Sequence, residues 1–186
     1  MVLRDDDVIV LDFLPRGRAD GRRAEPIAQV IGTKYFSLLE VVTRKDVTLK
    51  HGDKVYIGES KREKVDHIKR RIMMKDLTSF ARSELPFVVE KLVKEREEHF
   101  ANFFNTAQPI STRLHQLELL PGIGKKHMWD IIRERKKGKF KSFEDLKKRV
   151  KLLPDPMGSI VKRVMEELQD ENIRYRLFVA GPVRRY

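Results

Sequence analysis

The hydrophobic pattern changes its period near residue 76, and this change limits the folds that the chain can adopt. Before it, short runs rich in β-branched, aliphatic and aromatic residues alternate with Gly, Pro and charged turns, which is typical of β-strands. After it, apolar residues recur every three or four positions, which is typical of amphipathic helices. Strands followed by helices predict an α+β protein with a β domain at residues 1–75, linking helices at 76–109 and a helical domain at 110–186.

Four strands are expected in the first part, and a fifth segment stays open. The predicted strands are Val8–Leu14, Ile27–Ile31, Tyr35–Val42 and Lys54–Ile57. Between Val65 and Ile72 a strand and a helix fit nearly equally well, because the apolar residues there suit both periods. Four or five short strands in so short a segment suggest a small barrel, for which the five-stranded OB-fold is a common solution.

A basic loop joins the first two predicted strands. It runs from Pro15 to Pro26 and contains two glycines. Its arginines are Arg16, Arg18, Arg22 and Arg23. In OB-folds the loop between strands 1 and 2 is one of those that bind oligonucleotides. We weigh two interpretations equally: either these arginines contact nucleic acid, or the loop is solvated and has no role.

One long amphipathic helix is expected after residue 76. Apolar residues between Leu85 and Phe104 recur at helical spacing, with charged residues on the other side. Pro86 is tolerated in such a helix if it lies in the first turn. The segment Asn105–Pro109 then predicts a break, so a separate helical unit should start near Ile110.

The most informative motif is Leu120–Lys125, which reads Leu-Pro-Gly-Ile-Gly-Lys. We expect an amphipathic helix from Ser111 that ends at Leu120, a hairpin at residues 121–124, and a second helix from Lys125 to Arg135. The three segments together predict a helix, a hairpin and a second helix.

Phosphate binding is the chemistry that this hairpin suits. Gly122 and Gly124 permit backbone conformations closed to other residues and allow close approach of a ligand, while Ile123 is expected to point inward. Amides at a helix start lack intrahelical partners and carry partial positive charge, so a phosphate oxygen satisfies them. Lys125 and Lys126 follow directly, within reach of the same or a neighbouring phosphate.

Positive charge is concentrated around this motif. The chain has 40 Lys and Arg against 28 Asp and Glu, a net charge of +12, which favours a polyanionic partner. Residues 1–60 hold 10 basic and 10 acidic side chains, whereas residues 111–151 hold 13 basic and 5 acidic ones. The predicted nucleic-acid contacts are Leu120, Pro121, Gly122, Ile123, Gly124, Lys125, Lys126, Arg133, Lys136, Lys137 and Lys139, with Arg16, Arg18, Arg22 and Arg23 of the loop.

A second, degraded copy of the motif follows the first. Ser142 is expected to cap a helix that continues through Leu146–Val150, with Asp145 at its third position. The segment Leu152–Gly158 would form the turn, and Ser159–Leu168 the next helix. This turn lacks two closely spaced glycines and contains a carboxylate, which weakens a phosphate site. We therefore interpret the second copy as mainly structural, pairing with the first.

The segment Leu120–Lys125 resembles the helix-hairpin-helix family. The resemblance implies backbone binding that does not depend on sequence. In some members the hairpin carbonyls also hold a monovalent cation, which here would involve Leu120, Gly122 or Ile123.

The whole chain also resembles an uncharacterised archaeal family, domain of unknown function 655. The resemblance rests on Gly52–Gly58, Ala81–Glu90, Phe103–Thr112 and above all Leu117–Lys126. It implies an OB-like domain, a helix-hairpin-helix domain and binding of nucleic acid, with RNA favoured over DNA as the partner. With the second copy, we expect tandem helix-hairpin-helix motifs in the helical domain.

Other function classes find little support in the sequence. The absence of cysteine excludes disulfides and thiolate metal sites, and we expect a cytoplasmic protein with no membrane segment and no cofactor. No two histidines lie three or four residues apart, so no helical pair of histidine metal ligands is available. We expect a binding protein and not an enzyme. Two alternatives stay open: a protein-interaction module of a transcription, translation or repair complex, and a nuclease or glycosylase. The oligomeric state also stays open.

Overall fold

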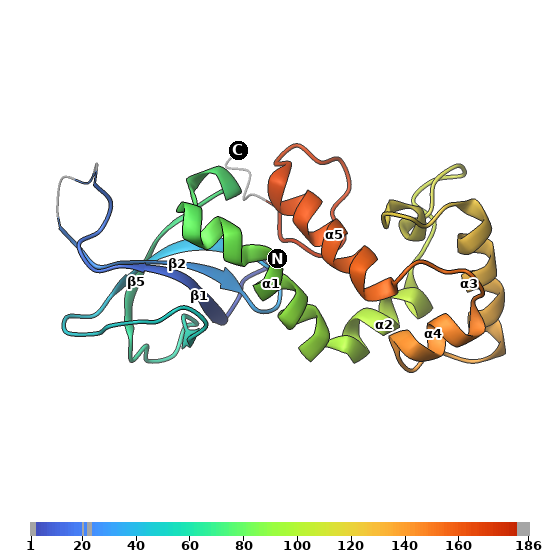
Figure 1. Cartoon of the computed structure of the whole chain (residues 1–186), viewed down its shortest axis with the longest axis horizontal. Helices are drawn as coiled ribbons and strands as arrows, with labels where there is room; N and C mark the ends of the chain where they lie inside the picture. The colour runs from blue at the N-terminus through green and yellow to red at the C-terminus, as the bar shows by residue number, and fades with distance from the viewer. Residues whose placement is uncertain (1–2, 20, 22–23, 182–186) are drawn as a thin grey trace. The chain divides into compact units, whose positions relative to one another are not determined.

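The computed structural model describes residues 3–19, 21 and 24–181. The chain forms two compact units, and Figure 1 labels the helices α1–α5 and several of the strands. The first combines the chain up to Val88 with the chain from Glu167 on, and the second comprises Val89–Glu166. The unit boundaries therefore lie inside two helices, Ser79–Glu95 (α1) and Pro156–Gln169 (α5), and differ from the predicted positions after residues 75 and 109.

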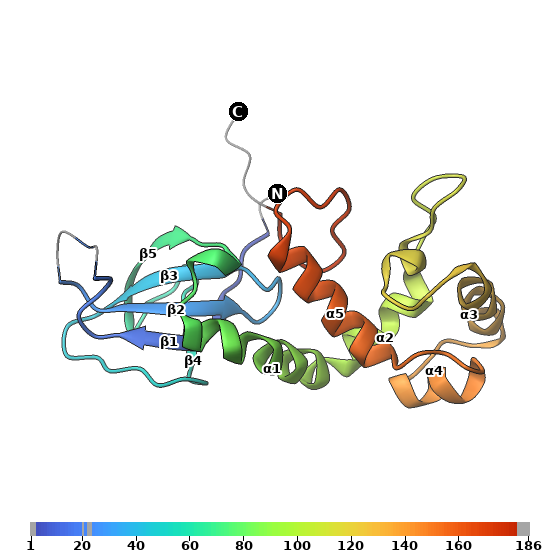
Figure 2. The ribbon, with the colours of Figure 1, turned by 45° about the horizontal axis from the view of Figure 1, so that its top comes forward.

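The first unit contains a five-stranded sheet (Figure 2). Its strands are β1 (Asp7–Leu14), β2 (Ile27–Gly32), β3 (Leu38–Thr43), β4 (Lys54–Tyr56) and β5 (Val65–Arg71). They lie in the order β4-β1-β2-β3-β5, and every neighbouring pair is antiparallel. The sheet curls into a half-barrel, so the α+β class is confirmed, whereas the predicted small barrel is present as a half-barrel.

The segment between Val65 and Ile72, whose apolar spacing suits a strand and a helix nearly equally well, forms a strand. β5 pairs with β3, and Val65 is its one buried residue. Because the remaining side chains of this edge strand are exposed, no alternation of apolar and polar residues marks it in the sequence. The strand predicted at Tyr35–Val42 begins later, at Leu38, because Phe36 has a φ of 54° and interrupts the extended backbone.

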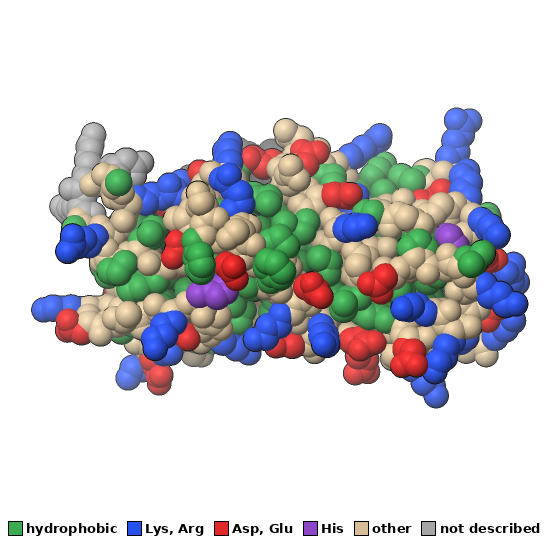
Figure 3. Space-filling model, in the orientation of Figure 1, with side chains coloured by type: hydrophobic (Ala, Val, Ile, Leu, Met, Phe, Trp, Pro, Cys, Tyr) green, Lys and Arg blue, Asp and Glu red, His purple; other side chains and the backbone are tan. Residues whose placement is uncertain are grey.

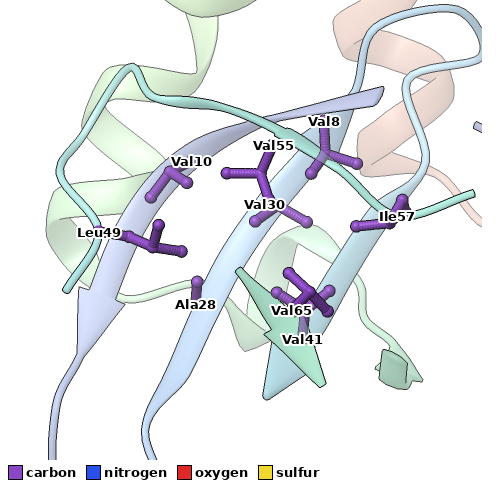
Figure 4. Packing of buried hydrophobic residues seen from close by; sticks show 9 residues of the cluster. All are labelled: Val8, Val10, Ala28, Val30, Val41, Leu49, Val55, Ile57 and Val65. Atoms are coloured by element: carbon purple, nitrogen blue, oxygen red, sulfur yellow. The ribbon is translucent and has the colours of Figure 1, made fainter. Parts of the chain in front are cut away.

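Apolar side chains fill the inside of the curl (Figure 4). The cluster consists of Val8, Val10, Ala28, Val30, Val41, Leu49, Val55, Ile57 and Val65. All five strands contribute side chains to this cluster, so it is a common core of the whole sheet. Every residue of β2 is buried, including Gln29, because both faces of this central strand are covered.

A buried carboxylate on β3 connects the sheet to the segment before α1. Glu40 Oε1 accepts hydrogen bonds from Arg18 Nε (2.6 Å) and Gln29 Nε2 (3.2 Å), and Oε2 accepts one from Arg70 Nε (2.8 Å). Arg18 and Gln29 also donate to the carbonyl oxygen of Asp76, at 2.7 and 3.0 Å. Burial by itself raises the pKa of Glu40, but the hydrogen bonds from these three side chains outweigh it and hold the pKa below its ordinary value of 4.5.

We expect Glu40→Gln to destabilise the protein by about 2–4 kcal/mol, because it leaves two arginines without their buried counter-charge. Since the folded-state pKa of Glu40 is lowered, its contribution to stability is present above pH 4.5 and is lost as the pH falls through the folded-state pKa. As the pH is lowered from 4.5, the free energy of unfolding should therefore fall less in the variant than in the natural protein. Urea denaturation followed by circular dichroism at several pH values measures both effects.

Glu25→Gln is the matched control. Glu25 pairs with Lys69, and both side chains keep about a third of their surface in water. Such a pair contributes at most about 1 kcal/mol. Equal losses of stability in the two variants would contradict the role assigned to Glu40.

The remaining elements are helical. They are the 3₁₀ turn η1 (Met74–Asp76), α1 (Ser79–Glu95), α2 (Glu97–Thr106), the 3₁₀ turn η2 (Gln116–Leu119), α3 (Lys125–Lys137), α4 (Phe143–Arg149) and α5 (Pro156–Gln169). The prediction of one long helix between Leu85 and Phe104 was wrong. Two helices occupy this segment, because the backbone leaves helical geometry at Arg96, with φ −113° and ψ 33°.

Pro86 lies in the interior of α1, and not in the first turn, where a proline is tolerated best. The helix begins earlier than the apolar pattern indicated, at Ser79, where Thr78 Oγ1 accepts a hydrogen bond from the amide of Ala81 (3.1 Å). The helix therefore continues past a residue that cannot donate to the carbonyl one turn before it.

The second unit, Val89–Glu166, is the helical unit, and it has its own apolar core. Its buried side chains include Phe100, Phe104, Leu117, Leu120, Ile123, Met128, Ile131, Phe140, Phe143, Leu146, Val150, Ile160 and Val164. Phe104 of α2 and Phe143 of α4 meet edge to face, with ring centroids 6.5 Å apart. The core thus holds together α2, η2, α3, α4 and α5 around the predicted hairpin.

The chain after α5 belongs to the first unit, which contains the sheet and is called the sheet unit. The carboxylate of Glu167 is buried and accepts hydrogen bonds from the amides of residues 177–179, at 2.7–3.1 Å. The amide of Ala180 donates to the carbonyl of Tyr35 (3.0 Å). The predicted domain 110–186 is therefore divided between the two units.

Candidate functional site

The hairpin at Leu120–Gly124 is a tight turn that depends on glycine. The amide of Ile123 donates to the carbonyl of Leu120 (3.1 Å), and Gly122, the third residue of the turn, has a φ of +85°. This is the type II pattern, which requires a positive φ at that position. Ile123 is buried, as predicted, and anchors the turn to the core. Gly124 has an ordinary φ of −94° and is the N-cap of α3.

The α-helix predicted to end at Leu120 is absent, and a 3₁₀ turn takes its place. Residues 110–114 form a loop, and η2 covers only Gln116–Leu119. His115 starts η2: its Nδ1 accepts from the amide of Leu117 (3.1 Å), and its own amide donates to Glu118 (2.9 Å). Burial first, and then the charge of Arg135, lower the pKa of His115, which favours the neutral ring that accepts this hydrogen bond.

The second helical pair braces the hairpin. Ser142 caps α4 through a hydrogen bond from the amide of Asp145 to its Oγ (3.1 Å), as the sequence predicted. Ser159 at the start of α5 donates from Oγ to the carbonyl of Pro121 (2.8 Å). A methyl group on Gly122 would lie 3.2 Å from Pro154 Cγ, so the two turns are in close contact. The segment from Leu152 to Ser159 therefore packs against the hairpin.

The start of α3 is open to solvent. Gly122, Gly124, Lys125 and Lys126 are exposed, and the first turn of α3 contains no acidic residue. Among the described residues, no side chain caps the amides of residues 125–127. These amides therefore carry the partial positive charge of the helix start without an internal acceptor.

The structure divides the predicted cations of the helical unit into paired and unpaired side chains. Arg133 pairs with Asp130, and Lys137 with Glu134 (2.6 Å). The predicted contacts without an ion pair in the described part of the chain are Lys125, Lys126, Lys136 and Lys139. We call these four side chains the lysine surface. On the face drawn in Figure 3, Lys and Arg side chains gather over α3.

Two arginines of the same region have structural partners. Arg135 donates to the carbonyls of Phe104 (3.2 Å) and Ala107 (2.9 Å) at the end of α2. Arg149 donates to the carbonyl of Gly138 (2.7 Å) and lies over the ring of Phe140, 4.4 Å from its centroid. Both guanidinium groups therefore hold connections between helices, where orphan carbonyls favour a cation.

The predicted loop arginines have different surroundings. Arg18 belongs to the network of Glu40 and is therefore a structural residue in this fold. Arg16 is exposed. Arg22 and Arg23 lie outside the described residues.

The three carbonyls implied as cation ligands also differ. That of Leu120 accepts the hydrogen bond from Ile123 that closes the turn. Those of Gly122 and Ile123 accept no hydrogen bond within the described segments of the chain. The neighbouring carbonyl of Pro121 is used by Ser159. The turn therefore leaves two of the three implied oxygens available.

The sequence-based predictions left out one exposed side chain of α3, that of Trp129. It is 60% exposed on α3, four residues after Lys125 and four before Arg133. This spacing places the three side chains on one helix face, which was a signal readable from the sequence.

Among the described residues, neither a metal centre nor a membrane span finds support. No group of three or more His, Asp or Glu side chains is arranged to hold a metal ion there. None of the helices in that part of the chain combines the length and the apolar character needed to cross a bilayer.

Comparison with known proteins establishes the family. A family model described as protein of unknown function (DUF655) matches residues 4–180. This chain belongs to the DUF655 family. An uncharacterized protein of Methanocaldococcus jannaschii is 47% identical over 171 residues, which cover 91% of this chain and 77% of that protein. The crystal structure of a DUF655 protein from Archaeoglobus fulgidus is 48% identical, with a TM-score of 0.84, and the match covers 95% of this chain and 100% of that chain. The family resemblance seen in the sequence is thus confirmed.

We expect Gly122→Ala to destabilise the helical unit by about 1–2 kcal/mol, because alanine disfavours a positive φ and its methyl group meets Pro154. Gly124→Ala should cost less, at most about 1 kcal/mol, since its φ is ordinary and its methyl group faces open space, so that only the poorer capping by alanine acts against it. Urea denaturation followed by the fluorescence of Trp129, the only tryptophan, measures this unit. A larger loss in the Gly124 variant would contradict the assignment of the turn.

Proposed function

We propose that this protein binds nucleic acid through the phosphate backbone, without sequence specificity. The observation that supports the proposal most directly is the exposed start of α3, where free amides and two lysines follow a glycine turn. A phosphate oxygen would satisfy these amides, and the helix dipole favours its negative charge. Because none of these groups reads a base edge, affinity should depend little on sequence.

The lysine surface extends the contact along α3 and just past its end. Lys125 and Lys126 lie at the start of α3, Lys136 lies in its last turn, and Lys139 follows it. Together with the amides they provide roughly four to six phosphate contacts, for which the logarithm of the affinity should fall with the logarithm of salt concentration with a slope of about −3 to −5.

Two finer assignments belong to the same proposal. The hairpin and α3 form a shortened helix-hairpin-helix motif with η2 as its first element, and α4 and α5 form the second copy. The half-barrel is OB-like and adds a second contact surface through the loop between β1 and β2. Arg16, Arg22 and Arg23 remain the contacts proposed for this loop, whereas Arg18 is left out because Glu40 holds it. RNA is favoured over DNA on the family resemblance alone.

We expect the double variant Lys125→Gln and Lys126→Gln to weaken binding to all sequences to the same degree, and to reduce the salt slope by about 1.5–2, since two phosphate contacts are lost. Fluorescence anisotropy of labelled RNA and DNA oligonucleotides, measured at several salt concentrations, provides both quantities.

Lys91→Gln with Lys94→Gln is the matched control. Both lysines are exposed, and both lie in the part of α1 that belongs to the helical unit. This variant loses the same net charge, so it should keep most of the affinity and of the salt slope. Equal effects of the two double variants would show that net charge, and not the start of α3, determines binding.

A protein-interaction module is a second candidate, and two exposed aromatic residues favour it. Phe80 and Phe87 on α1 are 48% and 67% exposed and lie seven residues apart, on one face of the helix. Under this hypothesis a pull-down with the whole protein would retain its partner after nuclease treatment, and Phe87→Ala would lose it. Loss of all partners after nuclease treatment would favour nucleic-acid binding.

A further inference from the structure

We infer that the indole ring of Trp129 is a stacking platform for an unpaired nucleobase. The inference rests on the proposed function, because it names the class of nucleic acid that the α3 surface takes: single strands and loops, in preference to a closed duplex. Trp129 is the only tryptophan of the chain and lies in the first half of α3.

The core of the helical unit does not use this ring. The inward positions of α3 are Met128 and Ile131, both buried, while Trp129 points to another face and stays 60% exposed. No aromatic or cation–π partner contacts it within the described residues. Exposure alone says little, since single apolar side chains are common on protein surfaces. The inference therefore depends on the cationic side chains that lie near the ring.

Four cationic side chains surround Trp129 along the helix. Lys125 and Lys126 lie four and three residues before it, and Arg133 and Lys136 lie four and seven residues after it. Positions three, four and seven apart share one helix face, and all five side chains are exposed. The stretch from Lys125 to Lys136 covers about 16 Å of the helix axis. Because Arg133 is paired with Asp130, the groups that attract phosphates on either side of the aromatic ring are Lys125, Lys126 and Lys136.

This combination of groups distinguishes between ligands. An apolar protein surface laid on Trp129 would bury the neighbouring lysines without counter-charges, which costs free energy. The acidic residue next to the ring, Asp130, is already paired with Arg133. A single strand offers a phosphate for the cations and a π-face for the indole in the same nucleotide. In a duplex the bases are already stacked and paired, so their faces are closed to the ring.

The fluorescence of Trp129 reports this contact directly. A short oligouridylate should quench the emission on titration, because the base stacks on the indole. An RNA duplex of the same length and inorganic polyphosphate supply phosphates without a free base face, so they should leave the emission nearly unchanged at saturation. Equal quenching by polyphosphate and by the single strand would overturn the inference.

Replacement of the ring tests its energetic contribution. Trp129→Ala should weaken binding of a labelled oligouridylate by about 5- to 100-fold, in line with the loss of one stacked base, and change duplex affinity by less than about 2-fold. Trp129→Phe, which keeps an aromatic face, should retain most of the affinity. Because the side chain is exposed, thermal unfolding followed by circular dichroism should be nearly unchanged. Phe87→Ala, the loss of another exposed aromatic ring, is the matched control and should not change the affinity.

The outcomes separate this inference from the proposed function. If Lys125→Gln with Lys126→Gln weakens binding but Trp129→Ala does not, the phosphate contact stands and the stacking platform is overturned. If no single strand, duplex or polyphosphate binds, both proposals fail. If Trp129→Ala abolishes capture of a protein that survives nuclease treatment and leaves oligouridylate binding unchanged, the ring is a protein contact and the inference is overturned.

Discussion

The candidate surface depends on one contact in the helical unit, between the hairpin at Leu120–Gly124 and the turn at Leu152–Gly158. Gly122 holds a φ of +85° against Pro154, and Ser159 holds the carbonyl of Pro121. A side chain at position 122 would be strained by the positive φ, and its Cβ would lie 3.2 Å from Pro154 Cγ, a tight contact. These contacts hold the hairpin in a conformation in which the start of α3 is exposed, and its first amides have no side-chain cap among the described residues.

The cationic side chains of the chain have two kinds of surroundings. Arg18, Arg135 and Arg149 donate to carbonyls or to a buried carboxylate inside their own units. A guanidinium has several donors in a planar fork, so one arginine can join two or three backbone segments. Lys125 and Lys136 have no such partners among the described residues and stay in water. Net charge alone thus overstates the surface available to a polyanion.

The errors of the sequence-based predictions share a physical origin. Apolar spacing reports which residues are buried, but a 3₁₀ turn and the first turn of a helix bury similar positions, so the pattern before Leu120 suited both. The edge strand β5 buries one residue of seven, which leaves no alternation to detect. The division at Arg96 depends on backbone angles of a charged residue that hydrophobicity does not record. Local patterns located the elements, while their type and ends followed from packing.

By itself, the sequence determined the α+β class, four of the five strands, the glycine hairpin with its inward Ile123 and the capping Ser142, because each depends on the conformational preferences of a few neighbouring residues. Only the tertiary structure decided that Arg18 pairs with Glu40 and that Ser159 donates a hydrogen bond to the hairpin. It also decided that Trp129 stays in water beside unpaired lysines. The physical reason is distance along the chain. The first two outcomes depend on partners tens of residues away, which no local pattern encodes. Local spacing places Trp129 on one face with Lys125 and Arg133, but the packing of the unit decides that the ring stays in water.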